Sequence, residues 1–127
     1  MKRTISTDDA PAAVGAYSQA TTNGDLLFTA GQLPLTTGGE LLDDESVAVQ
    51  TEQCLENVAA ILAAADLSLE DVLKTTIYLD DIDDFEEMNE TYGEYFGESR
   101  PARSAVEVGN VPKGAALEIE AIADASE

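Results

Sequence analysis

The chain has 127 residues, of which 26 are acidic and 6 are basic, and its formal net charge is -20. This length predicts a single domain spanning residues 1–127, with a hydrophobic core of its own. A phosphate-binding surface needs clustered Lys and Arg, so the charge argues against nucleic acid and anionic membrane surfaces as partners. No apolar run reaches the roughly 20 residues of a membrane helix, and no signal-peptide pattern opens the chain. We therefore expect a cytoplasmic protein.

The side-chain inventory also limits the chemistry. The chain has no histidine, and Cys54 is its single cysteine. We expect no intrachain disulfide and no zinc or other transition-metal site. Hydrophobic residues make up 44% of the chain, which argues against disorder. Because the negative charge is spread along the sequence, we expect a salt-loving source organism, where strong salt screens self-repulsion.

Short strands are predicted in the first part of the chain. Residues 2–6 fit an edge strand, and a loop leads to a second strand that begins near Tyr17. The Asn23-Gly24 pair predicts a hairpin with a type I′ turn, in which both central residues have positive φ. Residues 26–30 are the return strand of this hairpin.

A change of hydrophobic period marks the middle of the chain. Residues 33–44 are predicted to form an exposed loop, and apolar residues at three- and four-residue steps predict an amphipathic helix over 46–65. Residues 74–79 alternate as a strand does. A second helix is predicted over 83–96, with large apolar side chains at helical spacing that face the core. Gly97, the next residue, ends this helix.

The stretch from Arg100 to Ala123 is predicted to be a hairpin with a turn at residues 111–114. Strand alternation puts Arg103 on one face of its strand, and Glu118 and Glu120 on one face of the partner strand. A guanidinium and carboxylates would then look out of neighbouring strands. The full order is β-β-β-α-β-α-β-β, which predicts a two-layer α+β domain with two helices on one face of a mixed sheet.

Several stretches together carry a family resemblance. They are A-P-A-A-V-G-A-Y-S-Q-A at 10–20, T-A-G-Q-L-P at 29–34, K-T-T-I-Y-L-D-D-I-D-D-F at 74–85, and P-A-R-S-A-V-E-V at 101–108 with its partner L-E-I-E-A-I-A at 117–123. The sequence resembles the RidA/YjgF family of enamine and imine deaminases over nearly its whole length, from Ile5 to Ala123.

The resemblance implies a chorismate-mutase-like fold assembled as a homotrimer, with pockets at the subunit interfaces. It also implies an activity, the hydrolysis of reactive 2-imino acids such as 2-iminobutanoate and 2-iminopropanoate to 2-keto acids and ammonia. No metal and no organic cofactor is expected.

By the same resemblance, three side chains are catalytic candidates. Arg103 would hold the substrate carboxylate, a role that suits a planar fork donating parallel hydrogen bonds. Glu118 would position or activate the attacking water, and Tyr17 would pack over the substrate. The alternative for Arg103 is a surface or interface ion pair with Glu107 or another acidic residue. The alternatives for the other two are a solvated role for Glu118, of the kind we assign to Glu120, and a core role for Tyr17.

Further positions are expected to line the substrate pocket. Asn89 matches a pocket position on the second helix, and Gly31 would let backbone approach the ligand closely. Otherwise Asn89 is an ordinary polar helix residue and Gly31 a strand-end turn. Ala105 stands where many family members have a cysteine, and Ala30 stands where a serine is frequent. Phe85, Met88 and Tyr92 are interpreted as core residues.

Other functions keep the fold but change the meaning of the pocket. The trimer could bind small carboxylates through Arg103 without catalysis, or act in protein interaction as a chaperone does. Ribonuclease activity, attributed to some relatives, fits poorly because the chain lacks histidine and would repel RNA.

Overall fold

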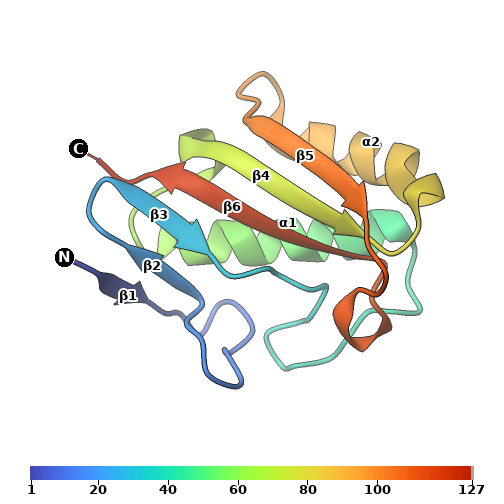
Figure 1. The fold of residues 1–127 in the computed structure, drawn as a ribbon, viewed down its shortest axis with the longest axis horizontal. Helices are drawn as coiled ribbons and strands as arrows, with labels where there is room; N and C mark the ends of the chain where they lie inside the picture. Colours follow the sequence, from blue (N-terminus) through green and yellow to red (C-terminus); the bar gives the residue numbers. More distant parts are fainter. Residues whose placement is uncertain (127) are drawn as a thin grey trace.

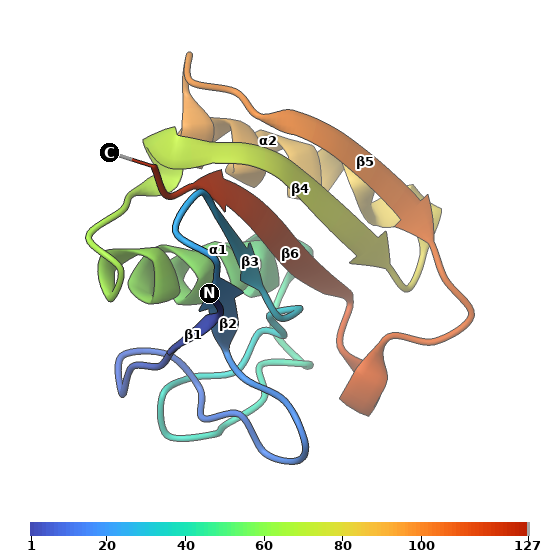
Figure 2. The same ribbon diagram turned by 60° about the vertical axis from the view of Figure 1, so that its left-hand side comes forward.

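The computed structural model, which describes residues 1–126, shows a mixed six-stranded sheet covered on one face by α-helices (Figure 1). The opposite face of the sheet carries no helix (Figure 2). The strands are β1 (Arg3–Ile5), β2 (Ala20–Thr22), β3 (Leu26–Thr29), β4 (Val72–Leu79), β5 (Ala102–Glu107) and β6 (Leu117–Asp124). The helices are α1 (Val47–Ala63) and α2 (Phe85–Phe96), with 3-10 turns η1 (Leu69–Asp71), η2 (Ile82–Asp84) and η3 (Pro112–Gly114). The predicted fold class and element order are confirmed.

The predicted hairpin between β5 and β6 is wrong. The strand order is β1-β2-β3-β6-β4-β5, so β4 lies between the two strands that were expected to pair. β4 pairs with β5 in parallel and with β6 antiparallel. The reason is the crossover through α2, which returns the chain to the end of the sheet where β4 began. β5 therefore runs in the same direction as β4, and β6 comes back along the other side of β4.

Helix α1 supplies much of the core. The Ser46 side chain caps it by accepting a hydrogen bond from the Val49 amide at 3.2 Å. Its predicted apolar stripe is buried against β4, β6 and α2, and consists of Cys54, Leu55, Val58, Ile61 and Leu62. Cys54 is fully buried, and burial raises the pKa of its thiol. It is a core side chain, as its place in the stripe predicted.

The hairpin of β2 and β3 forms, but its details differ from the prediction. Gly24 has a φ of 97°, whereas Asn23 is not among the positive-φ residues, so the turn is not type I′. The Asn23 carboxamide oxygen instead accepts hydrogen bonds from two following amides. β2 begins at Ala20 rather than near Tyr17, because the Gln19 carboxamide bonds backbone groups of the preceding loop.

The segment 33–44 is a loop, as predicted, but it is anchored at its start. The carboxamide nitrogen of Asn57 on α1 donates hydrogen bonds to the carbonyls of Leu33 at 3.1 Å and Leu35 at 2.9 Å. Asn57 is 1% exposed, so these bonds satisfy buried groups. Neither helix in the described part of the chain has the length and apolar character to cross a membrane.

Candidate active site

Arg103 faces the helices and is held by α2. Its residue partner on β4 is Thr75, which is buried and shares a 2.7 Å hydrogen bond with the Tyr92 hydroxyl. The guanidinium donates to the Asn89 carboxamide oxygen at 2.7 Å. It also lies 4.8 Å from the centre of the Tyr92 ring and 5.3 Å from that of Phe85. We call Arg103, Asn89, Phe85 and Tyr92 the arginine half-site.

The arginine half-site opens on a hollow of about 430 Å³ between α2 and β5. Its lining residues are Asn89, Tyr92, Gly93, Phe96, Arg100, Pro101 and Arg103. The arrangement can hold a small carboxylate, because a planar cation is oriented at its wall by neutral groups. The alternative ion pair of Arg103 with an acidic residue is not found among the described residues: the guanidinium donates to Asn89, and the Glu107 carboxylate accepts a hydrogen bond from the Ile82 amide at 2.9 Å.

Two members of this half-site were interpreted from sequence only as core residues. Phe85 is half-buried and Tyr92 is buried, and both rings also support the guanidinium. Their spacing contained the signal. Phe85, Asn89 and Tyr92 follow one another on α2 at steps of four and three residues, so they share one helix face. Ala105 follows Arg103 on the helix side of β5 and packs against the core, but it is not among the residues lining the hollow.

Glu118 lies on the opposite, helix-free face of the sheet. It stands across from Tyr78 on β4, and along β6 it alternates with buried Leu117 and Ile119. Its carboxyl group packs directly on Gly31: a Cβ atom at that position would lie 2.6 Å from the Glu118 Cδ. Burial, followed by the negative charge of Glu120, raises the pKa of Glu118. A raised pKa makes this carboxylate a stronger proton acceptor.

Tyr17 is beside this group and not in the core. It is 55% exposed, and it lines a shallow hollow that also includes Gly31. Gly31 therefore makes room for a side chain of its own chain, where the sequence suggested close approach to a ligand. We call Glu118, Gly31 and Tyr17 the glutamate half-site.

The described chain does not bring the two half-sites together. Arg103 points toward the helices and Glu118 away from them, and β4 lies between their strands. The expectation that they look out of neighbouring strands is wrong, because it rested on the hairpin that β4 interrupts. A site that uses both residues needs a second copy of the chain.

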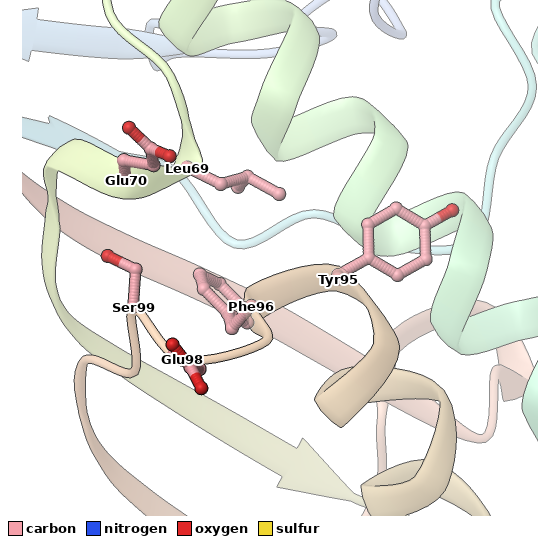
Figure 3. Close-up of a pocket in the computed structure, with 6 residues that line it drawn as sticks. All are labelled: Leu69, Glu70, Tyr95, Phe96, Glu98 and Ser99. Carbon is pink, nitrogen blue, oxygen red and sulfur yellow. The ribbon is translucent and has the colours of Figure 1, made fainter.

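A further hollow of about 350 Å³ shares Phe96 with the hollow of the arginine half-site. It is lined by Leu69, Glu70, Tyr95, Phe96, Glu98 and Ser99, and its two carboxylates point in different directions (Figure 3). It contains none of the predicted site residues. Within residues 1–126, no group of three or more His, Cys, Asp or Glu side chains is arranged to hold a metal ion.

The whole chain matches one protein family. The family model described as endoribonuclease L-PSP covers residues 7–125. The chain belongs to this family, which is also called RidA/YjgF. The RidA/YjgF resemblance noted in the sequence is thereby confirmed.

Relatives in the RidA/YjgF family match the chain from end to end. A RutC family protein of Pyrococcus horikoshii is 54% identical over 97% of this chain and 98% of its own. The 2-iminobutanoate/2-iminopropanoate deaminase of Escherichia coli is 46% identical, with the same coverage of 97% and 98%. A crystal structure of a putative endoribonuclease from Thermotoga maritima has a TM-score of 0.94 at 46% identity, covering 98% of each chain.

Solved relatives also include one with a ligand in its name. The structure of Escherichia coli TdcF with bound serine has a TM-score of 0.91 at 42% identity, covering 96% of this chain and 98% of TdcF. The names of these relatives differ in the activity they state, but their fold is the fold of this chain.

Proposed function

We propose that this protein hydrolyses 2-imino acids, of the size of 2-iminobutanoate and 2-iminopropanoate, to 2-keto acids and ammonia. The observation that carries the proposal is the Arg103 guanidinium, which is oriented by the Asn89 carboxamide and two aromatic rings at the wall of a hollow. These partners are uncharged, so the positive charge is left to bind a substrate carboxylate. A carboxylate bound in this way would present the adjacent imine carbon at a fixed place.

Similarity to named enzymes supports the same reaction. A relative with 46% identity is named 2-iminobutanoate/2-iminopropanoate deaminase, and TdcF has been crystallised with serine, an amino acid with an α-carboxylate. The family name endoribonuclease suggests RNA instead. A formal net charge of -20 and the absence of histidine argue against that substrate here.

The proposed chemistry needs one residue that both takes and returns a proton. With the substrate as the iminium ion, the oxygen of water bonds to the carbon while the Glu118 carboxylate takes one water proton. Glu118 then gives this proton to the amino nitrogen of the tetrahedral intermediate. The C–N bond breaks as the hydroxyl oxygen forms the new C=O bond, and the departing ammonia leaves with the hydroxyl proton as ammonium. A carboxylate within hydrogen-bond reach suffices for these transfers.

We further propose that the active sites form between copies of the chain in a homotrimer. The arginine half-site of one copy and the glutamate half-site of its neighbour would face each other across each interface, with Tyr17 packing over the substrate. A cyclic trimer repeats one heterologous contact and so contains three such sites. The placement of Arg103 and Glu118 on opposite faces of the sheet supports this arrangement.

The experiment that tests the function uses a threonine dehydratase to generate 2-iminobutanoate in the presence of semicarbazide, in high-salt buffer. We expect the protein to suppress semicarbazone formation, and we expect Arg103→Ala to lose most of this effect while keeping its assembly. Arg3→Ala is the matched control, since it removes a guanidinium from β1, which lies at the opposite edge of the sheet from β5. No suppression by the folded wild type, together with binding of keto acids, would favour a non-catalytic carboxylate-binding trimer.

A further inference from the structure

The helix-free face of the sheet carries an unequal pair of carboxyl groups. Glu118 and Glu120 are two positions apart on β6 and so point to the same side. Across from Glu118 on β4 stands Tyr78, and its hydroxyl donates a hydrogen bond to the Glu120 Oε1 at 3.0 Å. The tyrosine thus reaches diagonally past its direct neighbour to the second carboxylate.

The two carboxyl groups have different partners. Glu120 accepts a hydrogen bond from the Tyr78 hydroxyl, which holds its carboxylate in place on the sheet face. Glu118 packs against the Gly31 backbone, where burial disfavours its charge. Burial first, and then the charge of Glu120, raise the pKa of Glu118. Burial and the bond to Glu120 raise the pKa of Tyr78, so its hydroxyl keeps the proton that it donates.

Other titratable groups also lie around Glu118. Behind it on α1 is the Cys54 thiol, which burial and the charge of Glu118 keep neutral by raising its pKa. Lys74 on β4 stands across from Ile122, one residue pair beyond Glu120 on the same face. In the trimer, Arg103 of a neighbouring copy would also face Glu118, so its effect is common to all variants of the same assembly.

We propose that Tyr78 and Glu120 are positioning residues for Glu118: the tyrosine hydroxyl holds the Glu120 carboxylate beside Glu118, and that negative charge makes Glu118 the carboxyl group that accepts and returns the catalytic proton. The role rests on the proposed deaminase function. In many enzymes the environments of two carboxyl groups push their proton affinities apart, and one of the two then serves as the acid and base. Glu120 then acts through its charge and does not touch the substrate.

The test is a carbon-13 NMR titration of the Glu118 carboxyl group in the assembled protein without substrate. In the wild type we expect the Glu118 midpoint to lie above the ordinary value of a glutamate side chain. Glu120→Gln should lower the Glu118 midpoint, and Tyr78→Phe, which frees the Glu120 carboxylate to move away, should lower it by less. Glu98→Gln is the matched control, since it removes one negative charge from a different part of the surface.

The same variants are then assayed for deaminase activity against pH. Activity that needs ionised Glu118 falls as pH drops through its midpoint, so Glu120→Gln should move this acidic limb of kcat/KM to lower pH. At a pH below the wild-type midpoint, kcat/KM as a fraction of its plateau value should be about two- to threefold higher in Glu120→Gln than in the wild type. An unmoved limb in an active Glu120→Gln variant contradicts the proposal.

The titration separates this inference from the function on which it rests. If the Glu118 midpoint responds to Glu120→Gln no more than to Glu98→Gln, the proposal is overturned even in an active enzyme. If the Glu118 midpoint behaves as expected but the protein deaminates nothing, the effect of Glu120 on Glu118 stands, while its catalytic role fails together with the proposed function.

Discussion

Glycine at position 31 leaves the space that the Glu118 carboxyl group occupies. A Cβ atom there would lie 2.6 Å from the Glu118 Cδ and 2.9 Å from its Cγ, so Gly31→Ala must displace this side chain. We expect kcat/KM to fall by at least about tenfold, because misplacing a reacting group is costly. Stability should change little, since the side chain can move. Gly109→Ala is the matched control, because its new methyl group would have no atom within 4 Å apart from its own residue and its two chain neighbours. Equal activity of the two variants would refute this role of Gly31.

Candidate site residues could be named from the sequence more readily than their arrangement could. Short motifs brought attention to Arg103, Glu118 and Tyr17, since residue type and local spacing can be read directly from sequence. Which face of the sheet each occupies depends on strand pairing, and here that is set by contacts far apart in the chain. The support of the guanidinium by Tyr92 was missed for the same reason, because a buried aromatic at helical spacing also fits a core role.

Among the elements, α1 does more than fill the core. Through Asn57 it holds the loop that follows Gly31, with hydrogen bonds to the Leu33 and Leu35 carbonyls. Asn57→Ala removes this donor from two part-buried carbonyls, of which Leu33 keeps a hydrogen bond from the Leu35 amide, and we expect it to reduce the free energy of unfolding by about 2 kcal/mol. Denaturant unfolding at equal protein concentration measures the loss.

A neighbouring side chain on α1 gives the control for this prediction. The carboxamide nitrogen of Gln53 donates to the Asn57 oxygen at 2.9 Å, but it does not bond the loop. Gln53→Ala should therefore cost less than about 1 kcal/mol. If the two variants lose the same stability, the loop carbonyls are not what makes Asn57 important.

Element prediction succeeded where the signal was local and failed where it was not. The helical period predicts a helix over 46–65, within two residues of the observed ends of α1. The pairing of residues 100–123 as a hairpin was equally reasonable locally, since a turn does follow β5. It failed because the crossover through α2 makes β5 parallel to β4, and β6 gains two neighbours by pairing with β3 and β4. Loop length and strand pattern do not encode that choice.

The charge of the whole molecule predicts a response to salt. The excess of 26 acidic over 6 basic residues makes the folded chain repel itself. Burial first, and then neighbouring acidic residues, raise the pKa of Asp84. Protonated Asp84 therefore contributes to stability at low pH, and this contribution is lost as pH rises through that pKa. At neutral pH we therefore expect the thermal unfolding midpoint to rise between 0.1 and 1 M KCl, as the Debye length falls from about 10 to about 3 Å. Sorbitol at matched osmolality is the control, and an unchanged midpoint in KCl would remove the basis for a halophilic origin.

The opposite placement of the half-sites makes the assembly testable by mixing inactive chains. Arg103→Ala keeps the glutamate half-site and Glu118→Gln keeps the arginine half-site, so each variant alone should lack activity. When equal amounts are unfolded and refolded together, random trimers place an intact arginine half-site beside an intact glutamate half-site at about one interface in four. We therefore expect about a quarter of the wild-type rate to return, and each variant refolded by itself to stay inactive.

A site made within one chain would give no recovery, because every chain in the mixture has one defective half. Mixing without unfolding controls for exchange between preformed trimers, and the dependence of the recovered rate on the ratio of the two variants should peak at equal amounts.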